Sequence, residues 1–209
     1  MTRGARIDEA GLVHHVTGRS HSFAPAFPCP LARNRFLELL TPVADSLEWE
    51  IGAFSVLTTH YHFLLYTPEA TLSQGMRRLH GDYARWRNRH RGTRGPVWGE
   101  RFHSRPVASG LHIVRAAVYI DRNAVAAGLV ADPRDWPWSS FSANAGLGSP
   151  RSWHSPGLVH RSMGDDEATV GATYADLVER GLHGQGGTGG VRARSARPDP
   201  RPVKAQQPP

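Results

Sequence analysis

The order in which two hydrophobic periodicities alternate along the chain is the strongest constraint on its fold. Strands are predicted at residues 12–19, 49–57, 60–66 and 102–107, and amphipathic helices at about 31–47, 72–89 and 111–123. The resulting order is strand, helix, strand, strand, helix, strand, helix. This order favours an α+β domain with a mostly antiparallel sheet packed against helices, which is ferredoxin-like in outline.

The length and composition predict one main domain followed by smaller C-terminal parts. A chain of 209 residues with 39% hydrophobic content can bury one substantial core. We assign residues 1–147 to this main domain and residues 148–182 to a helical extension, with a helix expected at 165–182. Residues 183–209 are rich in glycine, proline and arginine without periodicity, so we expect a disordered basic tail.

Several protein classes are disfavoured by what the sequence lacks. The single cysteine, Cys29, cannot form an internal disulfide, and no apolar run approaches the roughly 20 residues needed to cross a bilayer. The first residues also lack the apolar stretch of a secretory signal. We therefore expect a soluble, cytoplasmic protein without a membrane partner.

Positive charge is concentrated in one segment of the chain. Residues 77–105 contain nine arginines and only two acidic side chains, so their local charge of +7 equals the net charge of the whole chain. Such concentration is typical of a surface that binds a polyphosphate, although a solvated helix face is the common alternative. Interleaved aromatic residues favour nucleic acid over that alternative. These aromatic residues are Tyr83, Trp86, Trp98 and Phe102.

Two histidines one residue apart, His60 and His62, begin the third predicted strand. Because side chains on a strand alternate between its faces, both imidazoles project from the same side and can hold one divalent cation. Paired histidines on a strand are more often ordinary core or surface residues. The pair therefore indicates a metal site only together with further groups.

Tyr119 and Asn123 are spaced i, i+4 in an apolar helical pattern, which places a phenol and a third potential ligand on one helix face. A helical tyrosine among apolar residues is more often part of the core, and Asn123 could instead cap the helix end before Gly128. Tyr61 and Tyr83 compete for the role of nucleophile. Tyr61 should point to the face opposite the histidines, whereas Tyr83 is better placed to stack on a base.

Six segments, taken together in their order and spacing, resemble the REP-associated tyrosine transposases, which are single-tyrosine HUH transposases of bacterial insertion sequences. They are His-Val-Thr-Gly-Arg at 15–19, Arg-Phe-Leu-Glu-Leu-Leu at 35–40, His-Tyr-His-Phe-Leu-Leu at 60–65, Trp-Gly-Glu-Arg-Phe at 98–102, Tyr-Ile-Asp-Arg-Asn-Ala-Val-Ala-Ala-Gly-Leu-Val at 119–130, and Asp-Trp-Pro-Trp-Ser-Ser at 135–140. The resemblance covers residues 11–146, about two thirds of the chain. Two departures stand out, because Leu-Thr-Thr at 57–59 replaces the family's usual Met-Pro-Asn and Ala124 replaces its usual proline. The first change could loosen the turn that orients His60.

The resemblance implies a ferredoxin-like fold whose central strand carries two metal-binding histidines beside a helix with a nucleophilic tyrosine. On this sequence the implied metal ligands are His60, His62 and Asn123, and the implied catalytic residue is Tyr119. The implied cofactor is a divalent cation, Mg²⁺ or Mn²⁺, which would polarise the scissile phosphate. Tyr119 would form a covalent 5'-phosphotyrosine and release a 3'-hydroxyl, which permits strand transfer without an external energy source.

The partner that the resemblance implies is single-stranded DNA with a hairpin, such as a repeated palindromic element. Whether the protein is a monomer or a homodimer stays open. The arginines and tryptophans of the basic segment are the candidate phosphate contacts and stacking platforms. These DNA-binding candidates are Arg77, Arg78, Arg85, Trp86, Arg87, Arg89, Trp98, Arg101 and Arg105.

Two other functions compete with a transposase. A non-catalytic DNA-binding protein could keep the fold and the basic surface, but both histidines and the tyrosine are present. A histidine-dependent RNA phosphodiesterase is disfavoured, since its acid and base histidines would lie on separate elements rather than as neighbours on one strand.

Overall fold

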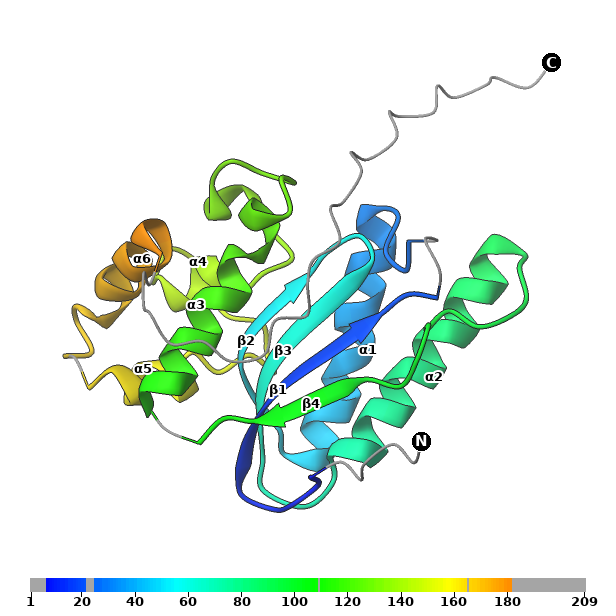
Figure 1. The fold of residues 1–209 in the computed structure, drawn as a ribbon, viewed down its shortest axis with the longest axis horizontal. Helices are drawn as coiled ribbons and strands as arrows, with labels where there is room; N and C mark the ends of the chain where they lie inside the picture. The colour runs from blue at the N-terminus through cyan, green and yellow to red at the C-terminus, as the bar shows by residue number, and fades with distance from the viewer. Residues whose placement is uncertain (1–6, 22–24, 109, 165, 182–209) are drawn as a thin grey trace, which may run out of the picture.

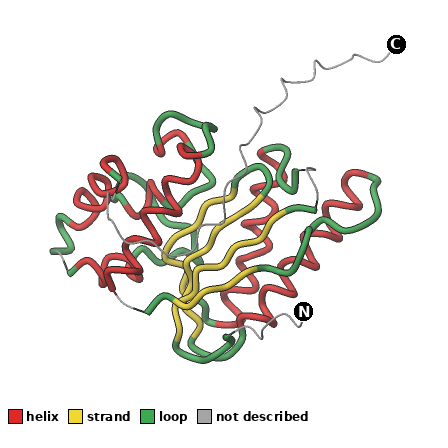
Figure 2. The backbone as a smooth tube through the Cα atoms, viewed as in Figure 1, coloured by secondary structure: helices red, strands yellow, loops and turns green. Residues whose placement is uncertain are grey.

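The computed structural model describes residues 7–21, 25–108, 110–164 and 166–181 of the chain. Within these residues, four strands form one sheet, with helices packed on both of its sides (Figures 1 and 2). The strands are β1 Leu12–Arg19, β2 Glu50–Val56, β3 His60–Thr67 and β4 His103–Pro106. The helices are α1 Pro30–Leu47, α2 Leu72–Arg91, α3 Gly110–Ala126, the 3-10 helix η1 Pro133–Asp135, α4 Phe141–Asn144, α5 Gly157–Met163 and α6 Val170–Arg180.

The sheet has the strand order β2-β3-β1-β4, and every neighbouring pair is antiparallel. This order, with α1 between β1 and β2 and α2 between β3 and β4, is the ferredoxin-like arrangement. The fold prediction made from the order of hydrophobic patterns is therefore confirmed. As a result β3, which carries His60 and His62, is an inner strand with hydrogen-bonded neighbours on both sides.

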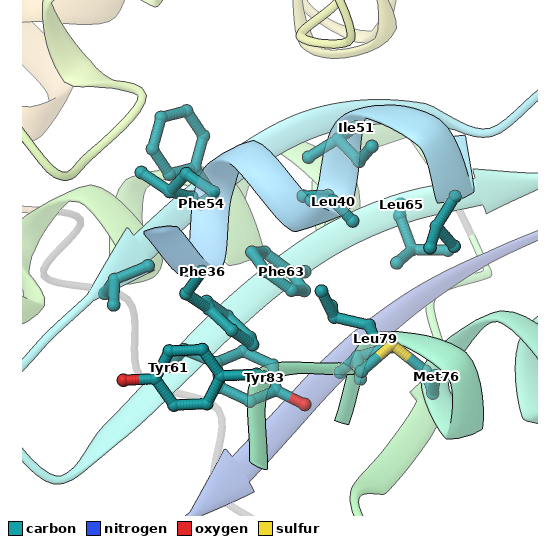
Figure 3. Packing of buried hydrophobic residues seen from close by; sticks show 14 of the residues in the cluster. Phe36, Leu40, Ile51, Phe54, Tyr61, Phe63, Leu65, Met76, Leu79 and Tyr83 are labelled. Carbon is teal, nitrogen blue, oxygen red and sulfur yellow. The ribbon is translucent and has the colours of Figure 1, made fainter. Parts of the chain in front are cut away.

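One face of the sheet is buried under α1 and α2. The apolar residues of both helices meet the inward-facing residues of β2 and β3 in one core (Figure 3). Its side chains include Phe36, Leu40, Ile51, Phe54, Tyr61, Phe63, Leu65, Met76, Leu79 and Tyr83. Each fully buried large apolar side chain contributes about 1.5–3 kcal/mol, so this core fixes the sheet and both helices as one body.

The other face of the sheet carries α3, which packs against β2 and β3. Ala53 and Leu64 point from these strands to Val118 in a second buried cluster. Helices α5 and α6 pack in turn on α3, so the C-terminal helices gather beside β2 (Figure 1). The polar residues that remain on this face towards β1 and β4 form the candidate site.

The C-terminal third differs most from the sequence prediction. The helix expected at 165–182 is shorter, running from Val170 to Arg180 as α6. Helix α5 was not predicted at all, because its seven residues are too few to show a helical period. Residues 131–142, which include η1, are joined to the end of β2 by the backbone bond from Val56 N to Trp138 O, at 2.9 Å.

Within the described ranges, no helix is long and apolar enough to cross a membrane. The tail predicted for 183–209 lies outside the described residues, so its disorder stays a prediction.

Candidate active site

Antiparallel pairing brings polar side chains from three strands onto the face of the sheet that α3 shares. Residues directly opposite one another on neighbouring strands project to the same side. The pairs are Thr17 with His62, Arg19 with His60, and His15 with Arg105. This face therefore carries three histidines flanked by two arginines.

His60 and His62 lie together on β3 as predicted, with ring centroids 5.3 Å apart. Burial lowers the pKa of His60 to about 4 and that of His62 to about 2. The nearby positive charge of Arg19 lowers both pKa values further. Both imidazoles are consequently neutral near pH 7, and the neutral form is the one that binds a metal.

The third histidine of the face, His15, contacts His62 directly. His15 Nε2 and His62 Nδ1 are 3.0 Å apart, and the two rings stack with their centroids 5.3 Å apart. Burial lowers the pKa of His15 to about 4, helped by the positive charge of Arg105. The two rings thus meet as neutral groups joined by one hydrogen bond.

Tyr119 lies on α3 beside these histidines. Its ring meets His62 edge-on at a centroid distance of 5.7 Å and His15 at 5.9 Å. The Tyr119 side chain is 54% exposed, whereas its neighbours Val118 and Ile120 are 2% and 0% exposed. The exposed fraction shows that Tyr119 is not a core residue, so its phenol is accessible to a substrate on the histidine face.

The two tyrosines that compete with Tyr119 are both buried in the core under the other face (Figure 3). The Tyr61 hydroxyl lies 2.6 Å from His80 Nε2, and the Tyr83 hydroxyl donates to the carbonyl of Ala26 at 2.7 Å. Burial raises the pKa of each phenol well above its usual value. The prediction that Tyr83 stacks on a base is wrong, because its α2 position faces the core rather than solvent.

Asn123 lies one helical turn after Tyr119, and its Nδ2 donates to the Tyr119 carbonyl at 2.7 Å. It therefore does not cap the helix end, since α3 continues to Ala126. Within the described residues no group of three His, Cys, Asp or Glu side chains can hold a metal ion. A cation on His60 and His62 would need a ligand of another type, and the Asn123 amide oxygen is such a ligand. Neutral imidazole nitrogens and an amide oxygen are donor types that divalent cations accept.

The turn before His60 is well anchored despite its unusual sequence. Backbone bonds join Ser20 N to Thr59 O at 2.8 Å and Phe27 N to Thr58 O at 2.9 Å. The guanidinium of Arg33 also donates to Thr58 Oγ1 at 3.3 Å. The two backbone bonds do not depend on residue type, and the bond to the Thr58 hydroxyl is a further contact that a proline could not make.

Asp121 fixes the helix that carries Tyr119. It is fully buried and accepts hydrogen bonds from the Ser140 hydroxyl at 2.6 Å and the Tyr174 hydroxyl at 2.7 Å. Burial raises the pKa of this carboxyl to about 7. The Ser140 Oγ also accepts from the backbone N of Phe54, at 2.9 Å. Asp121 therefore ties α3 to β2 and to α6.

The predicted DNA contacts divide between the two faces of the sheet. Arg105 lies on β4 opposite His15, and Arg101 is exposed in the segment that leads into β4. The other arginines lie on α2, which covers the face opposite Tyr119. They are Arg77, Arg78, Arg85, Arg87 and Arg89. Some are already engaged, since Arg87 donates to the Pro25 carbonyl at 2.9 Å and Arg85 forms an ion pair with Asp82.

The two tryptophans proposed as stacking platforms are half-buried. The Trp98 ring stacks on His80 at a centroid distance of 4.0 Å, and its Nε1 donates to the His80 carbonyl at 3.1 Å. The Trp86 ring stacks on His90 at 5.1 Å. One face of each indole is therefore occupied by a histidine, and stacking on DNA by either ring stays a prediction.

His15 and Arg19 were missed as site residues by the sequence prediction. The register between β1 and β3 brings both onto the histidine face, although they are about 45 positions from His60 and His62 along the chain. The alternation of side chains along β1 could have indicated them, because His15 and Arg19 lie an even number of residues apart and therefore project from the same face of the strand.

The chain is similar to one protein family and to two solved structures. Residues 25–123 match the family model described as "Transposase IS200 like". No curated protein matches the chain at a significant level. A solved structure of a REP-associated tyrosine transposase bound to a REP hairpin is 21% identical, covers 72% of this chain and 89% of its own, and superposes with a TM-score of 0.61. A putative transposase from Deinococcus radiodurans is 17% identical, covers 53% and 89%, and has a TM-score of 0.40.

The family match includes both histidines, Tyr119 and Asn123, and the structural match shows that the main domain has the fold of a REP-associated tyrosine transposase. Residues 25–123 of the chain therefore match the IS200-like transposase family, and the fold around them is that of a REP-associated tyrosine transposase.

Proposed function

We propose that this transposase-family protein nicks and rejoins single-stranded DNA through a covalent 5'-phosphotyrosine on Tyr119. The observation that supports this most is the exposure of Tyr119 beside His62 on the open part of the sheet face. The four other tyrosines are less suited, since Tyr61, Tyr83 and Tyr174 are fully buried and Tyr66 lies at the far end of β3 from His60.

Three side chains would hold the divalent cation, Mg²⁺ or Mn²⁺, that the reaction needs. They are His60, His62 and Asn123. When bound, the cation supplies charge that polarises a non-bridging oxygen of the scissile phosphate. The neutral state of both imidazoles keeps their lone pairs available for this role near pH 7.

Tyr119 performs the covalent step. Its phenol oxygen gives up its proton and attacks the phosphorus, the bond from phosphorus to the 3'-oxygen of the leaving strand breaks, that oxygen takes up a proton, and the phosphotyrosine forms on the 5' side. The released 3'-hydroxyl, or one from another strand, can attack the phosphotyrosine and reform a phosphodiester. Because the ester bond is conserved at each step, strand transfer needs no external energy source.

The DNA would approach along the histidine face. Arg19 and Arg105 flank the histidines there and are exposed, so they are suited to contact phosphates on either side of the scissile bond. The related structure holds a REP hairpin, and we propose a hairpin-forming repeat as the substrate of this chain as well. The arginines of α2 would then contact DNA that extends past the catalytic face, rather than the scissile phosphate.

We also propose that two parts of the chain have different roles. Residues 1–147 would form the catalytic unit, and residues 148–182 would form an extension that supports α3. The packing of α5 and α6 on α3, together with the bond from Tyr174 to Asp121, favours this role.

A covalent-capture assay tests the proposal. Purified protein is incubated with labelled single-stranded hairpin DNA from beside its own gene and Mn²⁺, and the products are separated on a denaturing gel. We expect a protein–DNA adduct in the wild type and in Tyr66→Phe, and none in Tyr119→Phe. An adduct that persists in Tyr119→Phe would refute the assignment of the nucleophile.

The second candidate is a non-catalytic DNA-binding protein of the same fold. It predicts hairpin binding by the wild type without any adduct, across several flanking hairpins and with Mg²⁺ or Mn²⁺. The accessible phenol beside His62 favours the enzyme over this candidate.

A further inference from the structure

We infer that His15 is a positioning residue, whose Nε2 accepts the Nδ1 proton of His62 and so leaves Nε2 of His62 bare to face a divalent cation. This inference rests on the proposed function and assigns a role to a histidine outside the implied ligand set.

The bond between His15 and His62 restricts the proton positions on both rings. Their nitrogens, His15 Nε2 and His62 Nδ1, are 3.0 Å apart, and a hydrogen bond of this length contains one proton. Either His62 donates from Nδ1 and keeps Nε2 bare, or His15 donates and His62 carries its proton on Nε2. Only the first arrangement allows His62 to bind a cation through Nε2.

The second ligand histidine is held in the same way. His60 Nδ1 lies 3.1 Å from the hydroxyl of Thr59, which can accept its proton. In both rings the contact made inside the protein uses Nδ1, so Nε2 is the nitrogen left for a shared ligand. A common tautomer with Nδ1 protonated therefore presents two lone pairs on the same face of β3.

Neighbouring charge favours this tautomer. Arg19 lies opposite His60 in the strand register and acts electrostatically on both His60 and His62. A bare nitrogen with its lone pair is favoured over an N–H group near a positive guanidinium.

His15 is rigidly placed for this role. It lies in the middle of β1, paired with Leu64 of β3 on one side and Arg105 of β4 on the other. Its ring also meets Tyr119 at 5.9 Å. Because β1 is hydrogen-bonded on both edges, the backbone of His15 is held opposite β3, and the bond to His62 and the contact with Tyr119 orient its ring.

The expected consequence is a weaker cation site when His15 is lost. Partners that orient a metal-binding histidine typically account for about 10- to 100-fold in metal affinity. We therefore expect His15→Phe, which keeps a ring in place but removes the acceptor, to weaken Mn²⁺ binding by that factor. His15→Gln should restore most of the affinity, because its Oε1 can accept the Nδ1 proton.

The direct test is the tautomer of His62 itself, measured in the metal-free protein from the ¹⁵N shifts of its imidazole by long-range ¹H–¹⁵N NMR. We expect His62 to carry its proton on Nδ1 in the wild type and in His15→Gln, and to shift towards Nε2 in His15→Phe. His90→Gln, exposed at the end of α2 where its ring stacks on Trp86, serves as the matched control and should leave the spectrum of His62 unchanged.

Mn²⁺ binding, followed by titration calorimetry without DNA, is the second readout. A wild-type His62 protonated on Nε2, or an unchanged tautomer and Mn²⁺ affinity in His15→Phe, would overturn the inference. The wild-type spectrum needs no variant, so it decides the question even if His15→Phe does not fold. Absence of Mn²⁺ binding by the wild type would count against the proposed function, while the tautomer of His62 would still decide the role of His15.

Discussion

We predict that the free energy of unfolding falls at acidic pH largely because of His154. This histidine lies in the C-terminal extension and packs on the sheet. Its side chain is 5% exposed, its ring meets Phe54 edge-on, and its Nε2 donates to the carbonyl of Gly52 at 3.3 Å. Burial lowers the pKa of His154 to about 4, although the bond to Gly52 acts in the opposite direction. The charges of His160 and Arg151 lower the pKa further.

The magnitude follows from the difference between the folded and unfolded pKa values. His154 has a pKa of about 4 when folded, against 6.5 in an unfolded chain. Between these values the unfolded state binds the extra proton, so the free energy of unfolding falls as pH is lowered. At about 1.4 kcal/mol per pKa unit, the loss is about 2 kcal/mol between pH 6.5 and pH 5 and about 3 kcal/mol by pH 4.

Urea unfolding of the wild type and of His154→Gln at pH 7.5 and pH 5 measures the contribution of His154 to the free energy of unfolding. Glutamine keeps an amide donor for the Gly52 carbonyl but does not titrate. We expect the wild type to lose about 2 kcal/mol more than His154→Gln over this interval. His90→Gln, at the exposed end of α2, controls for the loss of a surface histidine and should follow the wild type. Parallel losses in the wild type and His154→Gln would refute the reasoning.

Two further predictions concern the support of α3 and the DNA-binding face. Asp121→Ala leaves the hydroxyls of Ser140 and Tyr174 without their buried acceptor, so the free energy of unfolding should fall by about 1–3 kcal/mol for each hydroxyl that loses its partner. Urea unfolding measures this loss. A loss no larger than that of Asp135→Ala, at an exposed position, would contradict the prediction. Arg19→Ala should weaken binding of single-stranded hairpin DNA and reduce the salt slope by about one. Fluorescence anisotropy across a salt series measures both, and an Arg19→Ala variant with the affinity and salt slope of the wild type would contradict the prediction.

Much of the fold could be predicted because its determinants are local. The bounds of β1 were predicted to the residue, and those of α1, α2 and β3 within about two residues, since apolar residues repeat there at a strand or helix period. Helix α5 was not predicted, because a helix of seven residues is too short to show a helical period in the sequence. The pairing of His60 with His62 on one side of β3 was likewise a local property, fixed by the alternation of side chains along a strand.

The arrangement of the candidate site was decided by tertiary structure. Tyr83 and Tyr119 both lie in helices of similar pattern, and only the docking of α2 and α3 on the sheet buries the first and exposes the second. The charge of the basic segment is plain in the sequence, but the packing of α2 places most of its arginines on the face opposite Tyr119.

The sequence by itself therefore determined which elements form, which residues each one presents and which family the motifs resemble, because these depend on neighbours along the chain. Only the tertiary structure decided that β1 pairs with β3 and β4, which brings His15 to His62 and Arg19 to His60. Strand register is set by the packing of the whole sheet on its helices, and no local pattern specifies which distant residue lies opposite.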